Sequence, residues 1–264
     1  MSMPLDTFFV QLLVDTARWQ FLFGTNSPLS LILLPLEKLE QRQAVSCLAS
    51  AELLHYARFT YPKRKLEWLG GRMAAKCAVM SAATAEIVDA VPQWSGLEVT
   101  AAPDGRPFVR IADNPDLVLP DISISHSHGL AVAMSVVHGR CGVDIQKVTE
   151  SVIRVQKKFA APAELDILQD LTGSGPKASQ LTLLWAAKEA LKKAVGTETL
   201  PGFLDVKLCR AAIEMDRELG TYFVFDLNLN DNTASRAGET FSVAVLFYKE
   251  HALAFTRITE QCMV

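Results

Sequence analysis

The stretch SQLTLLWAAKEALKKAV, residues Ser179–Val195, has the strongest helix pattern in the chain, and Gly196 follows at a position typical of a helix end. On a helix, Trp185, Glu189 and Lys193 follow one another at four-residue steps along one side. The adjacent apolar stripe consists of Leu184, Leu191 and Val195. Two interpretations stay open for the charged pair. In the first, Glu189 and Lys193 are an ordinary charged pair on a solvated helix face. In the second, Glu189 is a metal ligand or base, and Lys193 lies beside a bound anion.

Outward from this helix, each half of the chain reads as helical segments followed by strands. In the second half, a strand is predicted at 141–145, helical segments at 151–159 and 163–170, and β-rich segments at 203–208, 221–228 and 240–248. In the first half, strands are predicted at 31–34, 121–125 and 131–137, and helical composition covers 37–58 and 65–83. The sequence therefore predicts an α+β protein with two comparable halves, 1–139 and 140–264.

Composition narrows the class of protein. The chain has 264 residues, of which 50% are hydrophobic and 21% charged, so it can bury a sizeable core and is unlike a disordered chain. A formal charge of −3 argues against an overall electrostatic design for nucleic acid. Five scattered cysteines without a CxxC pair favour a reducing compartment. The sequence has no P-loop, GxGxxG, GxSxG or HExxH motif, which excludes several common enzyme classes.

Nothing in the sequence indicates export or a membrane. The first residues, MSMPLDTFF, lack the basic region of a signal peptide. The most apolar early stretch, Ser27–Leu36, is too short to cross a bilayer and contains Pro28 and Pro35. We therefore expect a soluble, cytoplasmic protein.

The segment Gly142-Val143-Asp144-Ile145-Gln146 has the pattern of a short strand. Strand alternation places Val143 and Ile145 on one face and Asp144 and Gln146 on the other. A carboxylate beside an amide could hold Mg²⁺, which takes one or two protein carboxylates together with water and phosphate oxygens. The alternative is an aspartate at a solvated strand end.

Two further polar segments have open interpretations. Three interpretations stay open for Ser125-His126-Ser127-His128. The segment forms a polar turn, it forms a strand end that contacts a phosphate, or it forms a His-x-His metal site without an obvious third ligand. The second segment is the basic run from Arg58 to Lys76. Its basic residues, together with the one in the turn at 104–107, form either a solvated surface or an anion-binding surface. They are Arg58, Lys63, Arg64, Lys65, Arg72, Lys76 and Arg106.

The order of these motifs resembles the 4′-phosphopantetheinyl transferase superfamily, and the length resembles its pseudo-dimeric Sfp/EntD-type members. The motifs are Asp-Gly-Arg-Pro-Phe at 104–108, Ser-Ile-Ser-His-Ser at 123–127, Gly-Val-Asp-Ile-Gln at 142–146 and Trp-Ala-Ala-Lys-Glu-Ala at 185–190 with Lys193. Leu-Gly-Gly-Arg at 69–72 and Phe-Ala-Ala-Pro-Ala-Glu at 159–164 resemble two further family segments. The similarity extends from about Arg58 to Gly196.

The resemblance implies transfer of the 4′-phosphopantetheine arm of coenzyme A to a serine of an apo acyl or peptidyl carrier protein. Adenosine 3′,5′-bisphosphate is the other product. The family fold is two similar α/β halves related by a pseudo-twofold axis, with the active site in the cleft between them. Mg²⁺, or Mn²⁺, is the implied cofactor. The implied enzyme is a monomer that binds neither nucleic acid nor membrane.

The resemblance also assigns roles to individual residues. Asp144 and Glu189 would hold Mg²⁺ on the diphosphate, with Gln146 as a third ligand, and Glu189 would be the base. Lys193 would offset negative charge on the diphosphate. Arg106, Ser125, His126, Arg58 and Arg72 would contact the phosphates of coenzyme A; Arg64 is added from charge and spacing alone.

One departure from the family pattern is Gln146, where many relatives have an acidic residue. An amide oxygen can ligate Mg²⁺ but brings no charge, and some family members also lack the third acid. Two alternatives belong to other classes. One is a catalytically silent module that binds coenzyme A or a carrier protein, although such a module has no need for Asp144, Glu189 and Lys193 together. The other is a His-x-His zinc hydrolase that uses His126, His128 and Asp144.

Overall fold

The computed structural model describes residues 10–12, 29–82, 93–111, 114, 116–173, 175–196, 202–216, 220–229 and 239–259. Helices and antiparallel strands are mixed along the chain, so the predicted α+β class is confirmed. The chain divides into two compact units. The first unit comprises Met1–Cys141 with Thr259–Val264, and the second comprises Gly142–Ile258.

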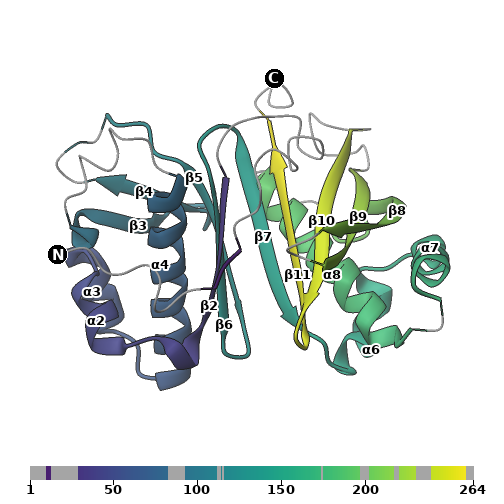
Figure 1. Ribbon diagram of the computed structural model, residues 1–264, viewed down its shortest axis with the longest axis horizontal. Helices are drawn as coiled ribbons and strands as arrows, with labels where there is room; N and C mark the ends of the chain where they lie inside the picture. The colour runs from purple at the N-terminus through teal and green to yellow at the C-terminus, as the bar shows by residue number, and fades with distance from the viewer. Residues whose placement is uncertain are drawn as a thin grey trace. The chain divides into compact units, whose positions relative to one another are not determined.

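In the first unit, one long helix lies against a four-stranded antiparallel sheet of order β1-β2-β6-β5 (Figure 1). The strands are β1 (Val10–Leu12), β2 (Leu29–Pro35), β5 (Asp121–Ser127) and β6 (Leu130–Val136). The long helix is α4 (Pro62–Ala82), and it packs on β2, β5 and β6. A separate antiparallel hairpin is formed by β3 (Leu97–Ala101) and β4 (Pro107–Ile111). The short helices are η2 (Leu36–Lys38), α2 (Gln41–Ser46), α3 (Ser50–Tyr56) and η3 (Trp94–Gly96).

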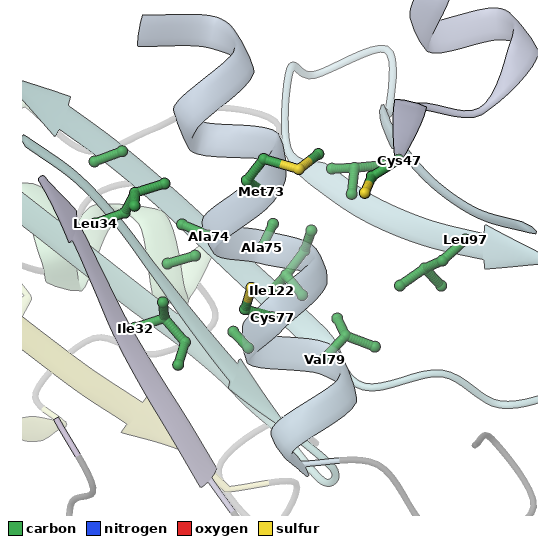
Figure 2. Close-up of a cluster of buried hydrophobic side chains, with 14 of the residues drawn as sticks. Ile32, Leu34, Cys47, Met73, Ala74, Ala75, Cys77, Val79, Leu97 and Ile122 are labelled. Atoms are coloured by element: carbon green, nitrogen blue, oxygen red, sulfur yellow. The ribbon is translucent and has the colours of Figure 1, made fainter. Parts of the chain in front are cut away.

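The buried face of α4 explains its place on the sheet. Leu69, Met73 and Cys77 recur at four-residue steps and are at most 1% exposed. Gly71 allows a close approach, because a Cβ there would lie 3.1 Å from Cγ2 of Ile124. Figure 2 shows this core, which includes Ile32, Leu34, Met73, Cys77, Leu97 and Ile122. Burial of each large apolar side chain contributes about 1.5–3 kcal/mol, so the packing of α4 on the sheet stabilises this unit.

The second unit has the same ingredients, a long helix on an antiparallel sheet (Figure 1). The strand order is β7-β11-β10-β9-β8. The strands are β7 (Arg140–Lys147), which begins in the first unit, β8 (Val206–Asp216), β9 (Gly220–Leu229), β10 (Thr240–Tyr248) and β11 (His251–Ile258). The helices are α6 (Ser151–Val155), η4 (Gln156–Lys158), α7 (Pro162–Thr172) and α8 (Lys177–Val195). Helix α8 packs on β11 and β10, in the middle of the sheet.

The helical composition of 37–58 is confirmed, but the structure divides this segment into η2, α2 and α3. The interruption lies at Ala49, whose backbone is extended with ψ 161°. Its N–H donates to the Glu52 carboxylate at 2.7 Å, which starts a new helix instead of continuing the old one. Helical composition alone does not reveal this cap.

Among the described residues, four strands were not expected from the sequence, namely β1, β3, β4 and β11. Every residue of β11 is buried. A strand covered on all sides shows no alternation of polar and apolar residues, which is the pattern that predicts strands. The β-rich segment expected at 203–208 begins instead at Val206 and continues to Asp216.

Candidate functional site

Helix α8 is buried along most of its length, and a partly exposed side contains Trp185, Glu189 and Lys193, as the four-residue spacing predicts. Trp185 lies between two aromatic rings. Its ring stacks on Phe203 with centroids 4.5 Å apart and meets Phe159 edge-on at 4.9 Å. These aromatic contacts hold Trp185 in place on α8, one helical turn before Glu189.

Gly142 sets how closely α8 approaches β7. A Cβ at this position would overlap the carbonyl oxygen of Ala190 and lie 2.8 Å from the backbone nitrogen of Ala194. Only glycine allows this backbone-to-backbone approach. The glycine thus brings Asp144, two residues further along β7, next to the charged side of α8.

Asp144 is 2% exposed and is held by two side chains. Lys193 donates from Nζ to Oδ1 at 2.7 Å and to the carbonyl oxygen of Val143 at 2.9 Å. Gln146 donates from Nε2 to Oδ2 at 3.0 Å, so Asp144 and Gln146 share a face of β7, as strand alternation predicts. Position 144 is therefore a buried carboxylate in a fixed orientation, compensated by one ammonium group.

Burial raises the pKa of Glu189 above its ordinary value, and the negative charge of Asp144 raises it further. The ammonium groups of Lys193 and Lys192 act in the opposite direction. The two carboxylates of Asp144 and Glu189 thus repel each other in a partly buried site. A positive charge between two such carboxylates would relieve this repulsion.

The donor set of this site fits a hard divalent cation. Asp144 and Glu189 provide carboxylate oxygens, and Gln146 would provide an amide oxygen if its side-chain amide turned over. Among the described residues, no three of His, Cys, Asp and Glu form a metal-binding cluster. A cation held here would thus have two carboxylates, with further positions for water or phosphate oxygens. Mg²⁺ is commonly bound in this way.

Arg106 of the first unit lies at the turn between β3 and β4. It donates from Nη2 to Oδ2 of Asp121 at 2.6 Å, and the same oxygen accepts the N–H of Cys141 at 2.8 Å. Both charged side chains are largely buried, at 16% and 21% exposure. Arg106 therefore ties its turn to the start of β5 and to Cys141, a contact that the sequence did not indicate.

Ser125 and His126 are neighbours in β5, so their side chains point to opposite faces of the strand. Ser125 is buried, whereas the His126 side chain is 47% exposed. The Nδ1 atom of His126 lies 3.9 Å from Oε2 of Glu67 on α4. Of the two, only His126 is open to a ligand on the helix-covered face of the sheet.

The basic residues of the first unit are in different environments. Arg58 and Arg64 are exposed. Arg72 is half-buried, with its guanidinium carbon 4.5 Å from the ring centre of Trp68. Its Nε is buried and has no hydrogen-bond partner within the described part of the chain, and burial lowers its pKa. Lys76 does not belong to this surface, since it is fully buried.

The structure brings Asp144, Gln146, Glu189 and Lys193 together in the second unit. Arg58, Arg64, Arg72, Arg106, Ser125 and His126 all belong to the first unit. Sequence reasoning missed Lys188, which is 0% exposed although it lies within the apolar stripe of α8. A lysine in an apolar stripe is the signal that could have indicated a buried anionic partner.

Comparison with known proteins finds a match between part of the chain and one protein family. Residues 140–255 match the sequence model of the 4′-phosphopantetheinyl transferase superfamily, which confirms the resemblance for this part of the chain. Among solved structures, the chain is similar to holo-[acyl-carrier-protein] synthase from Helicobacter pylori in complex with coenzyme A. The identity is 18% and the TM-score 0.27, over 41% of this chain and 98% of that chain. No curated protein matches the chain. None of the helices in the described ranges has the length and hydropathy that a bilayer crossing requires.

Proposed function

We propose that the chain is a phosphopantetheinyl transferase of the Sfp/EntD type, which moves the 4′-phosphopantetheine arm of coenzyme A to a serine of an apo carrier protein. The carrying observation is the contact of the Lys193 ammonium group with the buried Asp144 carboxylate of β7 at 2.7 Å, one helical turn after Glu189 on the same side of α8. It lies within the segment that matches the transferase superfamily.

The reaction breaks the phosphoanhydride bond in the diphosphate of coenzyme A and forms a phosphoester bond to the carrier serine. The serine oxygen forms a bond to the phosphorus that bears the pantetheine arm, and the bond from that phosphorus to the diphosphate bridging oxygen breaks. Adenosine 3′,5′-bisphosphate leaves with the electron pair of the broken bond. The serine proton must go to a base, and negative charge builds up on the leaving phosphate.

Three residues match these needs. Asp144 and Glu189 would hold Mg²⁺ or Mn²⁺, with Gln146 as a neutral third ligand; the bound cation supplies charge neutralisation at the diphosphate. Glu189 accepts the serine proton, directly or through water, because burial makes its carboxylate more basic than usual. Lys193 places its ammonium group beside Asp144, where it also offsets charge on the phosphates.

The first unit would supply the contacts to the nucleotide. His126, Arg58 and Arg64 present exposed basic groups, and Arg72 presents a half-buried one. Arg106 would contact the nucleotide while it keeps its ion pair with Asp121. Ser125 is buried and would contact the nucleotide only from the buried face of β5. The reaction requires an apo carrier protein as the partner that supplies the serine. We propose that the chain acts as a monomer.

The test is the intact mass of an apo acyl carrier protein after incubation with this protein, coenzyme A and Mg²⁺. We expect a gain of one phosphopantetheine arm, which is lost with EDTA and with Asp144→Asn. Arg42→Met is the matched control, since it removes an exposed charge at a residue with no proposed contact to coenzyme A or the cation. Absence of transfer to several carriers, with coenzyme A still bound in a calorimeter, would favour the catalytically silent module.

A further inference from the structure

Lys188 is the residue immediately before Glu189, and its ammonium group is completely buried. It contacts the Glu164 carboxylate at 2.8 Å, and it donates to the carbonyl oxygens of Phe159 at 2.6 Å and Phe203 at 3.1 Å. An ammonium group has three donors, and here each finds an acceptor on a different segment of the chain. Burial lowers the pKa of Lys188, and the Glu164 charge opposes this shift.

Glu164 connects the same point to two more backbone groups. Its Oε2 accepts the N–H of Ala161 at 2.7 Å, at the start of α7, and its Oε1 accepts the N–H of Leu208 at 2.7 Å, in β8. Both carboxylate oxygens of Glu164 are thus paired, with Lys188 and with backbone N–H groups of two neighbouring elements. A pair satisfied in this way holds one geometry, because any shift leaves a buried charge without a partner.

Glu189 therefore lies between two fixed points of α8. On one side, Lys188 is anchored to Glu164 and two carbonyl groups. On the other, the carbonyl oxygen of Ala190 lies against Gly142 of β7. Successive helix residues differ by about 100° in direction, so fixing the rotation at residue 188 fixes where the side chain of residue 189 begins.

The first unit contains a second copy of this network. Lys76 of α4 contacts Glu52 at 2.7 Å and donates to the carbonyl oxygens of Cys47 at 2.7 Å and Trp94 at 3.0 Å. Glu52 in turn accepts the backbone N–H groups of Ala49, at 2.7 Å, and Val99, at 3.1 Å. Each lysine donates to a carbonyl 29 residues before it, and each glutamate accepts an N–H three residues before it.

The two copies differ in the residue that follows the lysine. After Lys188 comes Glu189, which is partly exposed on the charged side of α8; after Lys76 comes Cys77, which is 0% exposed in the apolar core. The same anchor therefore positions a charged group in one unit and a core side chain in the other. In the first unit, the network therefore has no charged side chain directly after its lysine.

We infer that Lys188 and Glu164 are positioning residues for Glu189, which set the separation of its carboxylate from that of Asp144. This inference rests on the proposed function only for the effect on transfer; the effect on cation binding is independent of it. Loss of the pair frees the rotation of α8 at Glu189, so that the two carboxylates no longer converge on one cation.

The experiment compares Lys188→Met/Glu164→Gln with the matched pair Lys76→Met/Glu52→Gln in the full chain. Both variants remove an equivalent buried ion pair, so we expect similar drops in Tm. Mn²⁺ binding is then measured by calorimetry without coenzyme A or carrier protein. We expect at least a tenfold weaker Kd for the variant at 164 and 188, and a change of less than twofold for the variant at 52 and 76. The rate of transfer should follow the same order.

Equal Mn²⁺ affinity in the two folded variants would overturn the inference, and so would the absence of Mn²⁺ binding by the unaltered protein. If the unaltered protein binds Mn²⁺ but transfers nothing, the proposed function fails, while a selective loss of binding at 164 and 188 still supports positioning. If a double variant does not fold, Lys188→Arg and Lys76→Arg replace it. These keep the charge but not the fit, and again only the change at 188 should weaken Mn²⁺ binding.

Discussion

Replacing Gly142 by alanine adds one methyl group where β7 meets the backbone of α8. The added Cβ would overlap the carbonyl oxygen of Ala190 and lie 2.8 Å from the nitrogen of Ala194, whereas ordinary contacts of a Cβ begin at 3.4 Å. Both opposing atoms belong to helix backbone, which cannot rotate away as a side chain can. We therefore expect α8 to retreat from β7 by about 1 Å.

The size of the effect follows from this displacement. Overpacking of a core contact costs about 1–3 kcal/mol, and a clash between backbones belongs at the upper end, about 3 kcal/mol. The ion pair between Asp144 and Lys193, 2.7 Å long, crosses the same contact between β7 and α8. A misplacement of about 1 Å in a catalytic arrangement reduces the rate roughly 10²-fold, which is the loss of transfer that we expect.

The assay is urea unfolding of the unaltered protein, Gly142→Ala and Gly96→Ala, followed by transfer measurements at a temperature where all three are folded. Gly96 is the matched control, because nothing lies within 4 Å of a Cβ at that position. The expectation is contradicted if the free energy of unfolding of Gly142→Ala lies within about 0.5 kcal/mol of that of the unaltered protein and the two transfer at the same rate. The close approach of α8 and β7 would then not determine the geometry of the candidate site.

Three further outcomes are expected. With EDTA present, Glu189→Gln raises the free energy of unfolding at pH 7, because the folded state raises the pKa of this carboxylate and so disfavours its charge. The gain vanishes below pH 4.5, the ordinary value, where both states are protonated; no gain in urea unfolding at pH 7 contradicts this. Gln146→Glu tightens Mg²⁺ binding by adding a charged ligand, and an equal or weaker affinity in calorimetry places residue 146 away from the cation. Arg106→Met lowers the free energy of unfolding by about 1–3 kcal/mol, because Asp121 loses its cation, whereas exposed Arg64→Met changes it little; equal effects in urea unfolding would contradict the ion pair.

Much of the candidate site was predictable because its residues follow local periods. Four-residue spacing placed Trp185, Glu189 and Lys193 on one side of α8, and strand alternation placed Asp144 and Gln146 on one face of β7. The structure agrees on both points. The roles of these residues in transfer, and the Sfp/EntD type, stay predictions.

Other features could not be predicted, because their signals are not local. Strand β11 is buried throughout and has no alternation. The break before α3 depends on a hydrogen bond between Ala49 and Glu52, which a helical composition conceals. The hydrogen bond from Arg106 to Asp121 joins residues that are 15 positions apart, and the role of Arg106 as a ligand contact stays a prediction.

The sequence by itself determined the α+β class, the helix Ser179–Val195 to within two residues, and the identity of the charged residues on its exposed side, since all of these depend on spacings of two to four residues. Only the tertiary structure decided which partners those charges meet. Lys193 lies 49 residues from Asp144, and Lys188 lies 24 residues from Glu164. Such pairs form because burial makes an unpaired charge costly, and the packing of helix on sheet, not the order of the residues, selects which opposite charge is within reach.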